Sequence, residues 1–155
     1  MKSASASQPR VLAVASGGGH WVQLLRITRG LQGVDVVYVT TIAGYKSQIG
    51  NAPFHLVPDA NRWNKFRLAW MAFKLLLIVL RVRPAAVITT GAAPGYFALR
   101  FAKLLGAKAI WVDSIANAEE LSLSGKKAGE VADLWITQWK HLATEQGPQY
   151  FGAVL

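Results

Sequence analysis

Three short segments of the sequence combine glycine, hydroxyl and ionisable residues in patterns that suit a phosphorylated ligand. The first runs Ser16-Gly17-Gly18-Gly19-His20 and directly precedes a stretch with helical spacing. Glycines allow backbone N–H groups to approach a ligand closely, and a helix N-terminus adds about half a positive charge. This glycine segment therefore predicts a cradle for a diphosphate or another oxyanion, and its alternative is a tight strand-to-helix turn.

His20 stands at the predicted start of that helix and is a candidate general base. Its imidazole can accept a proton from an attacking hydroxyl group or donate one to a phosphate. The alternative is a histidine that caps or packs the helix. His55 and His141 lack such a setting, and we expect them to be structural or exposed.

The second segment, Thr89 to Gly95, again places hydroxyl groups and glycines ahead of a predicted helix, whose first turn holds Pro94. Its Thr90, Gly91 and Gly95 are candidate contacts for a phosphate or for the acceptor. The alternative is a plain turn between a strand and a helix.

The third segment begins where an apolar strand ends, at Asp113, and is unusually polar for this chain. Asp113 is a second candidate base, and its alternative role is the N-cap of a following helix. Ser114, Asn117 and Glu120 belong to the same stretch, where they would meet a sugar, a partner subunit or solvent.

The elements that position these segments alternate between strands and helices. We expect strands at Val11–Ala15, Val34–Thr40, Phe54–Val57, Ala86–Thr90, Lys108–Val112 and Leu134–Thr137, and helices at Trp21–Leu31, Asn64–Val82 and Tyr96–Leu105. This alternation is typical of an α/β fold with a doubly wound parallel sheet, a Rossmann-like domain. Such sheets bind ligands beyond the carboxyl ends of their strands, and all three segments follow strands. The sequence therefore predicts one site at that edge.

The length and composition limit the kind of protein this can be. A chain of 155 residues is about one domain. We expect residues 1–9 to form a disordered polar tail without a targeting signal, and residues 10–155 to form the single domain. The absence of cysteine excludes disulfides, cysteine zinc sites and a thiol nucleophile. No metal or cofactor is predicted.

The glycine segment is not a dinucleotide-binding fingerprint. Aligned to G-x-G-x-x-G, it places Val22 where the last glycine belongs, and no acidic residue closes the second strand after Thr40. The sequence also lacks a P-loop motif and a G-x-S-x-G nucleophile motif. An oxidoreductase would require tight NAD(P) binding, which the missing fingerprint disfavours.

The chain is strongly basic, with 17 Lys and Arg against 8 Asp and Glu and a formal charge of +9. Between Ala60 and Val112 there are nine cationic side chains and no acidic one. Such a balance favours nucleic acid, anionic lipid or a phosphorylated substrate as partner. No recognised nucleic-acid motif is present, and we expect no nucleic-acid partner.

The predicted helix Asn64–Val82 carries part of this charge as a stripe, because Arg67, Lys74 and Arg81 are spaced seven apart. Aromatic side chains flank the stripe, as at a bilayer interface. The alternative is an ordinary buried helix whose basic side chains reach solvent. The apolar region Leu68–Leu80 is shorter than the roughly 20 residues that span a bilayer. The candidate membrane-binding residues are Trp63, Arg67, Trp70, Lys74 and Arg81, and Leu68, Leu75, Leu76, Val79 and Val82 should pack on the sheet.

These motifs together resemble a known family. They are the glycine segment with His20, Arg83-Pro84 ahead of Thr89-Thr90-Gly91, and Asp113-Ser114-Ile115-Ala116-Asn117 leading to Ser124-Gly125-Lys126. From about Arg10 to Trp139 the chain resembles the acceptor-side subunit of split UDP-sugar glycosyltransferases, including PssD-type proteins of bacterial polysaccharide assembly. Their eukaryotic counterpart is the membrane-anchoring subunit of the UDP-GlcNAc transferase that adds the second GlcNAc to dolichyl diphosphate. The glycine segment also resembles the N-terminal half of MurG.

The resemblance implies the N-terminal half of a GT-B enzyme built from two polypeptides. This chain would hold a polyprenyl-diphosphate-linked saccharide at the cytoplasmic face of a membrane, and a second small protein would bring the UDP-sugar. Gly17 to His20 would cradle the acceptor diphosphate or line the cleft, supported by Thr90 to Gly95. His20 or Asp113 would be the general base of an inverting transfer.

Two expectations concern how the chain attaches to a membrane and whether it takes part in catalysis. The eukaryotic subunit has an N-terminal transmembrane helix, and none precedes Arg10 here, so we expect peripheral attachment through the helix Asn64–Val82. The alternative to a catalytic subunit is a non-catalytic membrane scaffold that recruits and activates the donor-binding enzyme.

Overall fold

The computed structural model describes residues 7–154 and contains one seven-stranded sheet in which all neighbouring strands pair in parallel. The strands are β1 (Arg10–Val14), β2 (Asp35–Thr40), β3 (Phe54–Leu56), β4 (Ala86–Thr89), β5 (Lys108–Val112), β6 (Leu134–Thr137) and β7 (Gln149–Tyr150). Their order is β3-β2-β1-β4-β5-β6-β7, so the strand sequence reverses between β1 and β4. The predicted doubly wound parallel fold is confirmed. Most of the expected tail, residues 1–6, lies outside the described residues.

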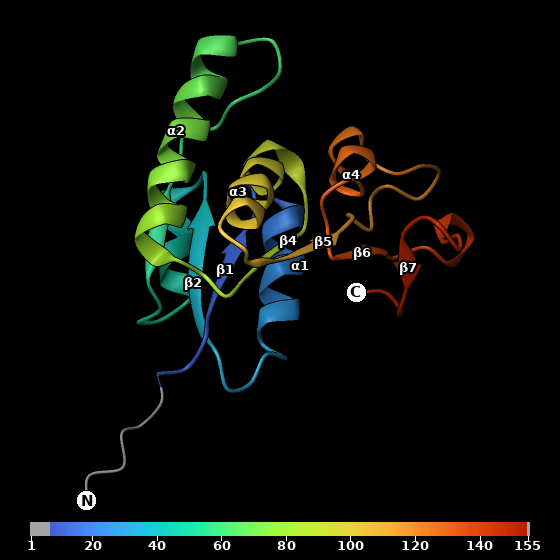
Figure 1. The fold of residues 1–155 in the computed structure, drawn as a ribbon, viewed down its shortest axis with the longest axis horizontal. Coiled ribbons are helices and arrows are strands. Elements are labelled where there is room, and N and C mark those ends of the chain that lie inside the picture. Colours follow the sequence, from blue (N-terminus) through green and yellow to red (C-terminus); the bar gives the residue numbers. More distant parts are fainter. Residues whose placement is uncertain (1–6, 155) are drawn as a thin grey trace, which may run out of the picture.

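The helices cover the two faces of the sheet unequally (Figure 1). They are α1 (Gly19–Thr28), α2 (Lys65–Val82), α3 (Ala92–Leu104) and α4 (Leu123–Ala128), with the 3-10 turns η1 (Ala43–Gln48) and η2 (Lys140–Leu142). The larger core cluster joins the sheet to α2, α3 and α4, and the smaller one joins the other face to α1 and η1. This distribution follows from the usual right-handed crossover between parallel strands. The chain moves from β1 to β2 through α1, and it moves in the opposite direction along the sheet through α2 (β3 to β4) and α3 (β4 to β5).

The central strand β1 shows why a strand of this sheet is a continuous apolar run in the sequence. Leu12 and Val14 belong to the larger core cluster, whereas Val11 and Ala13 belong to the smaller one on the opposite face. Successive side chains of a strand point to opposite faces, so a strand covered on both sides must be apolar at every position.

Helix α2 has clear start and stop signals. The side chain of Asn64 accepts a hydrogen bond from the Arg67 N–H at 3.0 Å, which satisfies one free donor of the first turn. The helix ends at Arg83, which adopts the left-handed conformation with φ 47° before Pro84. Four side chains of α2 are fully buried against the sheet: Met71, Leu75, Val79 and Val82. Three of these were expected, but the predicted Leu68 and Leu76 are only half-buried and Met71 takes the remaining core position.

The largest boundary error concerns α3, which begins at Ala92 instead of the predicted Tyr96. Pro94 does lie in the first turn of the helix, as predicted, because that turn has no need of the N–H that proline lacks. Gly95 is required there for packing, because a Cβ would collide with the side chain of Thr89. Helix α1 also starts and ends earlier than predicted, and α4, β7 and the two 3-10 turns were not predicted at all.

His55 on β3 makes the stability of the fold depend on pH. Burial, together with Arg81 on α2, lowers the pKa of His55 below its ordinary value of 6.5. The unfolded chain therefore binds more protons than the folded chain as pH falls through this range, and stability should be highest above pH 6.5. We expect wild type to lose more free energy of unfolding than His55→Gln between pH 7.5 and 5.5 (roughly spanning the shift), measured by urea denaturation. Parallel losses in the two proteins would contradict this assignment.

Candidate functional site

The site lies where the strand order reverses, at the carboxyl ends of β1 and β4. In doubly wound sheets this is the position at which the two loops diverge and leave a crevice. Here the loops are tied by a reciprocal pair of hydrogen bonds. The Thr90 hydroxyl donates to the His20 carbonyl at 2.6 Å, and His20 Nδ1 lies 2.8 Å from the Thr90 carbonyl oxygen.

This contact determines that Nδ1 of the half-buried His20 ring carries a proton. A carbonyl oxygen can only accept, so Nδ1 must carry the proton that it donates to Thr90. In the neutral ring the free lone pair then lies on Nε2. The Thr90 carbonyl thus sets the tautomer of the ring, and the role of His20 as a general base stays a prediction.

In the second segment, both the backbone conformation and the nearby His20 ring require a glycine at position 91. Its φ is +132°, and a Cβ there would lie 2.8 Å from Cε1 of His20. The next residue, Ala92, is also in the left-handed region with φ 64°. Strain of this kind costs about 1–3 kcal/mol and concentrates at functional sites. The glycine backbone at Gly91 thus leaves the space that the His20 ring occupies.

The glycine segment forms the other wall of the site. Gly18, with φ +66°, is the N-cap of α1, and it makes no side-chain capping hydrogen bond to the first turn of the helix. Gly18 and Gly19 are exposed, whereas Ser16 and Gly17 are half-buried. A Cβ on Gly17 would collide with Ile42, so this glycine provides room for the segment after β2. Helix N-termini are anion-binding positions in proteins, and the diphosphate cradle predicted for this segment stays a prediction.

Gly95, which we predicted to contact the acceptor, does not lie in an open loop. It is buried within α3 against Thr89, and its role in the structure is close packing of the helix on β4. Thr90 and Gly91 are therefore the part of the second segment that reaches the site. Thr90 is also buried, and it acts on the site through its two contacts with His20.

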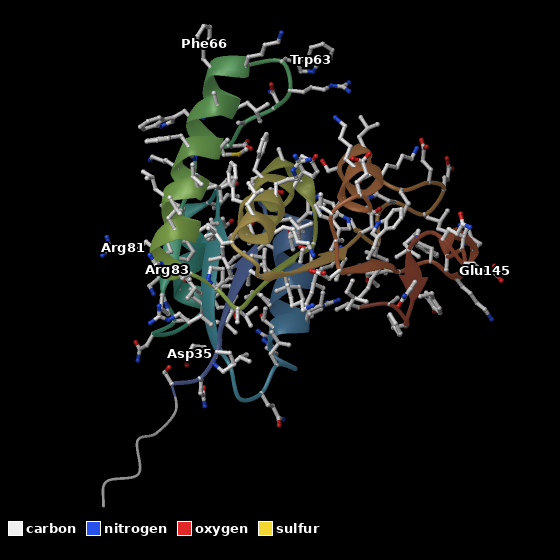
Figure 2. The ribbon with its side chains drawn as sticks, viewed as in Figure 1. Asp35, Trp63, Phe66, Arg81, Arg83 and Glu145 are labelled. Carbon is white, nitrogen blue, oxygen red and sulfur yellow. The ribbon has the colours of Figure 1, made fainter. Side chains whose placement is uncertain are left out.

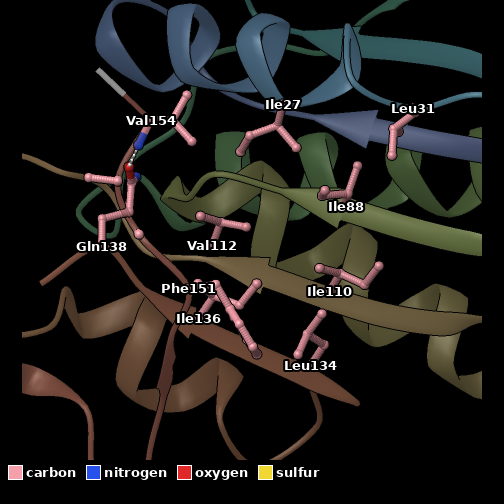
Figure 3. Close-up of a pocket in the computed structure, with 12 residues that line it drawn as sticks. Ile27, Leu31, Ile88, Ile110, Val112, Leu134, Ile136, Gln138, Phe151 and Val154 are labelled. Atoms are coloured by element: carbon pink, nitrogen blue, oxygen red, sulfur yellow. Dashed lines mark hydrogen bonds between the residues drawn. The ribbon is translucent and has the colours of Figure 1, made fainter. Parts of the chain in front are cut away.

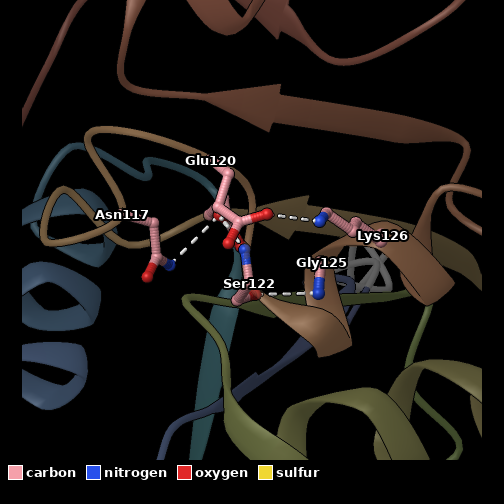
Figure 4. A network of polar contacts seen from close by, with 6 residues as sticks. Asn117, Glu120, Ser122, Gly125 and Lys126 are labelled. Carbon is pink, nitrogen blue, oxygen red and sulfur yellow. Dashed lines mark hydrogen bonds and ion pairs between the residues drawn. The ribbon is translucent and has the colours of Figure 1, made fainter.

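Asp113 is the centre of a hydrogen-bond network inside the third segment, and Figure 4 labels its neighbours Asn117 and Ser122. Its carboxylate is 1% exposed; Trp111 Nε1 and Ser122 Oγ donate to Oδ1 at 3.0 and 2.7 Å. Asn117 Nδ2 and the Ser122 N–H donate to Oδ2, each at 3.1 Å. The carboxylate is thus held by four donors, one from β5 and three from its own loop. The alternative role as a helix N-cap is wrong, because Ser122 caps α4 by accepting from Gly125 N–H.

The remaining predicted residues of the third segment fall into different environments. Ser114 is buried and accepts from Gln23 Nε2 at 3.3 Å, while Asn117 is half-buried beside Asp113. Glu120 is exposed and pairs with Lys126 at 2.7 Å. The hydrogen bond from Lys126 lowers the pKa of Glu120 below its ordinary value. Only Ser114 and Asn117 are thus joined to the network that reaches the other segments.

Gln23 on α1 connects the first and third segments, and sequence reasoning missed it. Its Oε1 accepts from the Ile115 N–H at 3.2 Å and from Gln138 Nε2 at 2.6 Å. Gln138 also donates to the Asp113 carbonyl at 2.9 Å. Both glutamines are buried, so this network fixes the third segment relative to the helix that begins at His20. Among the described residues, no group of three histidine or acidic side chains gathers as a metal site would need.

The outer face of α2 is the second surface of interest, and it projects beyond the other elements at its amino-terminal end (Figure 1). We define this α2 outer face by its exposed apolar side chains: Trp63, Phe66, Trp70, Phe73, Leu77 and Leu80. Phe66 is 92% and Trp63 is 79% exposed, at the tip seen in Figure 2. An exposed apolar row of this size marks a contact surface.

Cationic side chains line the α2 outer face, as the sequence predicted. Lys74 Nζ lies 5.5 Å from the centre of the Trp70 ring, and the Arg62 guanidinium lies 4.7 Å from that of Trp63. The ion pairs within residues 7–154 are Lys103–Asp133 and Lys126–Glu120, so none neutralises the helix. No helix in the described part of the chain is both long and apolar enough to cross a bilayer.

An apolar groove of about 380 Å³ lies on the same face of the sheet as α1, over the strands that α1 does not cover (Figure 3). Ile88, Ile110 and Leu134, from three neighbouring strands, form its floor. The segment 151–154 runs along it, and Phe151 there is 71% exposed. Gln138 lines the groove as well, so this apolar surface adjoins the polar network behind the site.

Comparison with solved structures identifies the class of fold. The chain is similar to MurG of Acinetobacter baumannii, with a TM-score of 0.74, 18% identity, and coverage of 90% of this chain and 44% of that one. It is also similar to the UDP-N-acetylglucosamine 2-epimerase of Rickettsia bellii, with a TM-score of 0.65, 14% identity and coverage of 86% and 40%. The protein is a Rossmann-like domain of the type found in GT-B folds, and it spans less than half of these chains.

Sequence comparison identifies the family within this class of fold. A family described as "Oligosaccharide biosynthesis protein Alg14 like" matches residues 64–154, and the chain belongs to this family. It is 26% identical to the mouse "UDP-N-acetylglucosamine transferase subunit ALG14" over 94% of this chain and 83% of that protein. The Candida albicans protein of the same name is 31% identical over 51% of this chain and 39% of its own length.

Proposed function

We propose that this chain is the acceptor-binding subunit of a glycosyltransferase that moves N-acetylglucosamine from UDP-GlcNAc to a polyprenyl-diphosphate-linked saccharide. The observation that carries the proposal is the His20 site, with its fixed tautomer beside an open glycine cradle, in a chain of the Alg14-like family. The names of the relatives supply the donor. In this proposal the N–H groups of the glycine segment hold the diphosphate of the polyprenyl acceptor.

The proposed reaction is an inverting transfer in which His20 is the general base. Nε2 takes the proton of the acceptor hydroxyl as its oxygen attacks the anomeric carbon of the donor sugar. The new glycosidic bond forms while the bond from the anomeric carbon to UDP breaks, and UDP leaves with the electron pair. Thr90 acts by holding the ring, and Gly91 leaves the space that the ring needs. Asp113 is a positioning residue in this scheme, since its oxygens already accept four hydrogen bonds.

We further propose that a separate subunit binds the donor and that catalysis takes place between the two chains. The relatives are named as subunits, and this chain has the extent of one half of the MurG structure. The apolar groove beside segment 151–154 is the surface that we expect the partner to cover, because exposed apolar grooves of this kind are interaction sites.

Ligand binding by the isolated chain tests this division of roles. Calorimetric titration with a short-chain polyprenyl-diphosphate-GlcNAc should give saturable binding, and UDP-GlcNAc at the same concentrations should give none. Binding of UDP-GlcNAc without binding of the acceptor would contradict the proposal, because the chain would then be the donor side.

The α2 outer face is proposed to hold the protein on the cytoplasmic face of a membrane. Apolar side chains enter the interface while lysine and arginine meet lipid phosphates, at about 1 kcal/mol for each cation. We expect Phe66→Glu/Trp70→Glu to reduce flotation with anionic phospholipid vesicles by about tenfold or more, because burying each such side chain contributes about 1.5–3 kcal/mol. Both residues are at least half exposed, so the variant should fold.

A matched control for this flotation experiment is Phe151→Glu. Phe151 is also an exposed phenylalanine, but it lies beside the groove and away from α2. This variant should float like wild type. Equal flotation of all three proteins would contradict the role of the α2 outer face.

A further inference from the structure

Tyr45, on η1, brings its hydroxyl group to the glycine segment. The Gly18 N–H donates to Tyr45 Oη at 3.0 Å. The phenol ring stacks on Trp21 with 4.9 Å between ring centres and 8° between ring planes. Trp21 is itself buried, and its Nε1 donates to Gln48 Oε1 at 2.9 Å. The position of the hydroxyl group is therefore fixed by packing on a core residue.

The hydrogen of this hydroxyl group remains available. A phenol donates one hydrogen bond and also accepts, and Tyr45 uses only its acceptor side, toward Gly18. Within residues 7–154 no group accepts the Tyr45 O–H. The ring is half-buried, whereas Gly18 and Gly19 beside it are exposed. The free donor thus lies next to the N–H groups that form the cradle.

We propose that the Tyr45 hydroxyl belongs to the acceptor-binding site and donates a hydrogen bond to an oxygen of the diphosphate held by the glycine segment. The inference rests on the proposed function and adds a residue to its ligand contacts. Donation from Gly18 to Oη polarises the phenol and strengthens its own donation. Hydrogen bonds to charged groups are the strong ones, so removing this one should weaken binding by about tenfold or more.

The test is Tyr45→Phe, which keeps the ring on Trp21 and removes only the hydroxyl group. The probe is geranyl diphosphate, titrated calorimetrically into the complete chain. The control is Tyr38→Phe: Tyr38 also contacts the Trp21 ring, at 5.7 Å, but its hydroxyl donates to the buried Thr28. We expect Tyr45→Phe to raise the dissociation constant about tenfold, and Tyr38→Phe to leave it unchanged.

Hydrogen exchange of Ser16, Gly17, Gly19 and His20 in the free proteins separates a ligand contact from a loop-holding role. Gly18 is left out of this readout because its own N–H loses the Tyr45 acceptor in the variant. A weakened Tyr45→Phe variant with wild-type exchange supports the inference. Weakened binding with faster exchange would overturn it, because the hydroxyl would then only hold the loop. An unchanged dissociation constant would overturn the Tyr45 contact alone. Failure of the wild-type chain to bind geranyl diphosphate would overturn both this inference and the proposed diphosphate cradle.

Discussion

Replacing His20 with asparagine should abolish most of the transfer activity while leaving the site assembled. An asparagine amide can still donate to the Thr90 carbonyl, as His20 Nδ1 does at 2.8 Å, but it has no basic nitrogen in the place of Nε2. Loss of a general base typically costs a factor of about 100 to 10,000 in rate. We expect a fall of this size in kcat of the enzyme reconstituted with its donor-binding subunit, and a similar dissociation constant for the acceptor.

The same experiment distinguishes the catalytic role from the scaffold alternative. A scaffold that only recruits the donor-binding enzyme has no use for Nε2 of His20, so His20→Asn would then transfer at a near-normal rate. Gly91→Ala is a second probe of the same ring, because the added Cβ would lie 2.8 Å from Cε1 of His20. Normal kcat in both variants would contradict the assignment of His20 as base.

Removing the carboxylate of Asp113 should have the largest effect on stability. In Asp113→Ala the donors from Trp111, Asn117 and Ser122 lose their common acceptor inside the protein. Unsatisfied buried donors cost about 1–3 kcal/mol each before relaxation, so we expect a loss of about 3 kcal/mol. In a chain of this size that lowers Tm by roughly 10 °C.

Thermal denaturation and hydrogen exchange of residues 114–122 measure the Asp113 effect. A positioning role predicts a lower Tm together with faster exchange in this segment for Asp113→Ala, and reduced transfer as a consequence. The outcome that would contradict the positioning role is an Asp113→Ala variant that loses transfer while its Tm and exchange stay at wild-type values.

The sheet and the edge that holds the site could be predicted because their signals are local. β1 is apolar at every buried position, since it packs on both faces, and it stops abruptly at the glycine segment. Parallel strands must end at a common edge, so the sequence could place Ser16–His20, Thr90 and Asp113 at one edge of the sheet. The seven-residue spacing of Arg67, Lys74 and Arg81 likewise predicts that these cations share one side of α2.

The supporting residues could not be predicted because their contacts are distant in sequence. Gln23 reaches Ser114, 91 positions away, and Gln138 reaches Gln23 across 115 positions. Tyr45 sits on a single 3-10 turn with no hydrophobic period, although its place after β2 puts it at the same sheet edge. Asp113 can be recognised in the sequence as an ionisable residue. The positions of its donors cannot, because three of the four depend on how the loop after Asp113 folds.

The most direct test of the central claim is a transfer assay on the separated and combined subunits. Radiolabelled UDP-GlcNAc and a polyprenyl-diphosphate-GlcNAc acceptor would be supplied to this chain, to the donor-binding subunit, and to their mixture. We predict labelled product from the mixture alone. Product formed by the donor-binding subunit without this chain would contradict the acceptor-binding role, and product formed by this chain alone would contradict the division of the enzyme into two polypeptides.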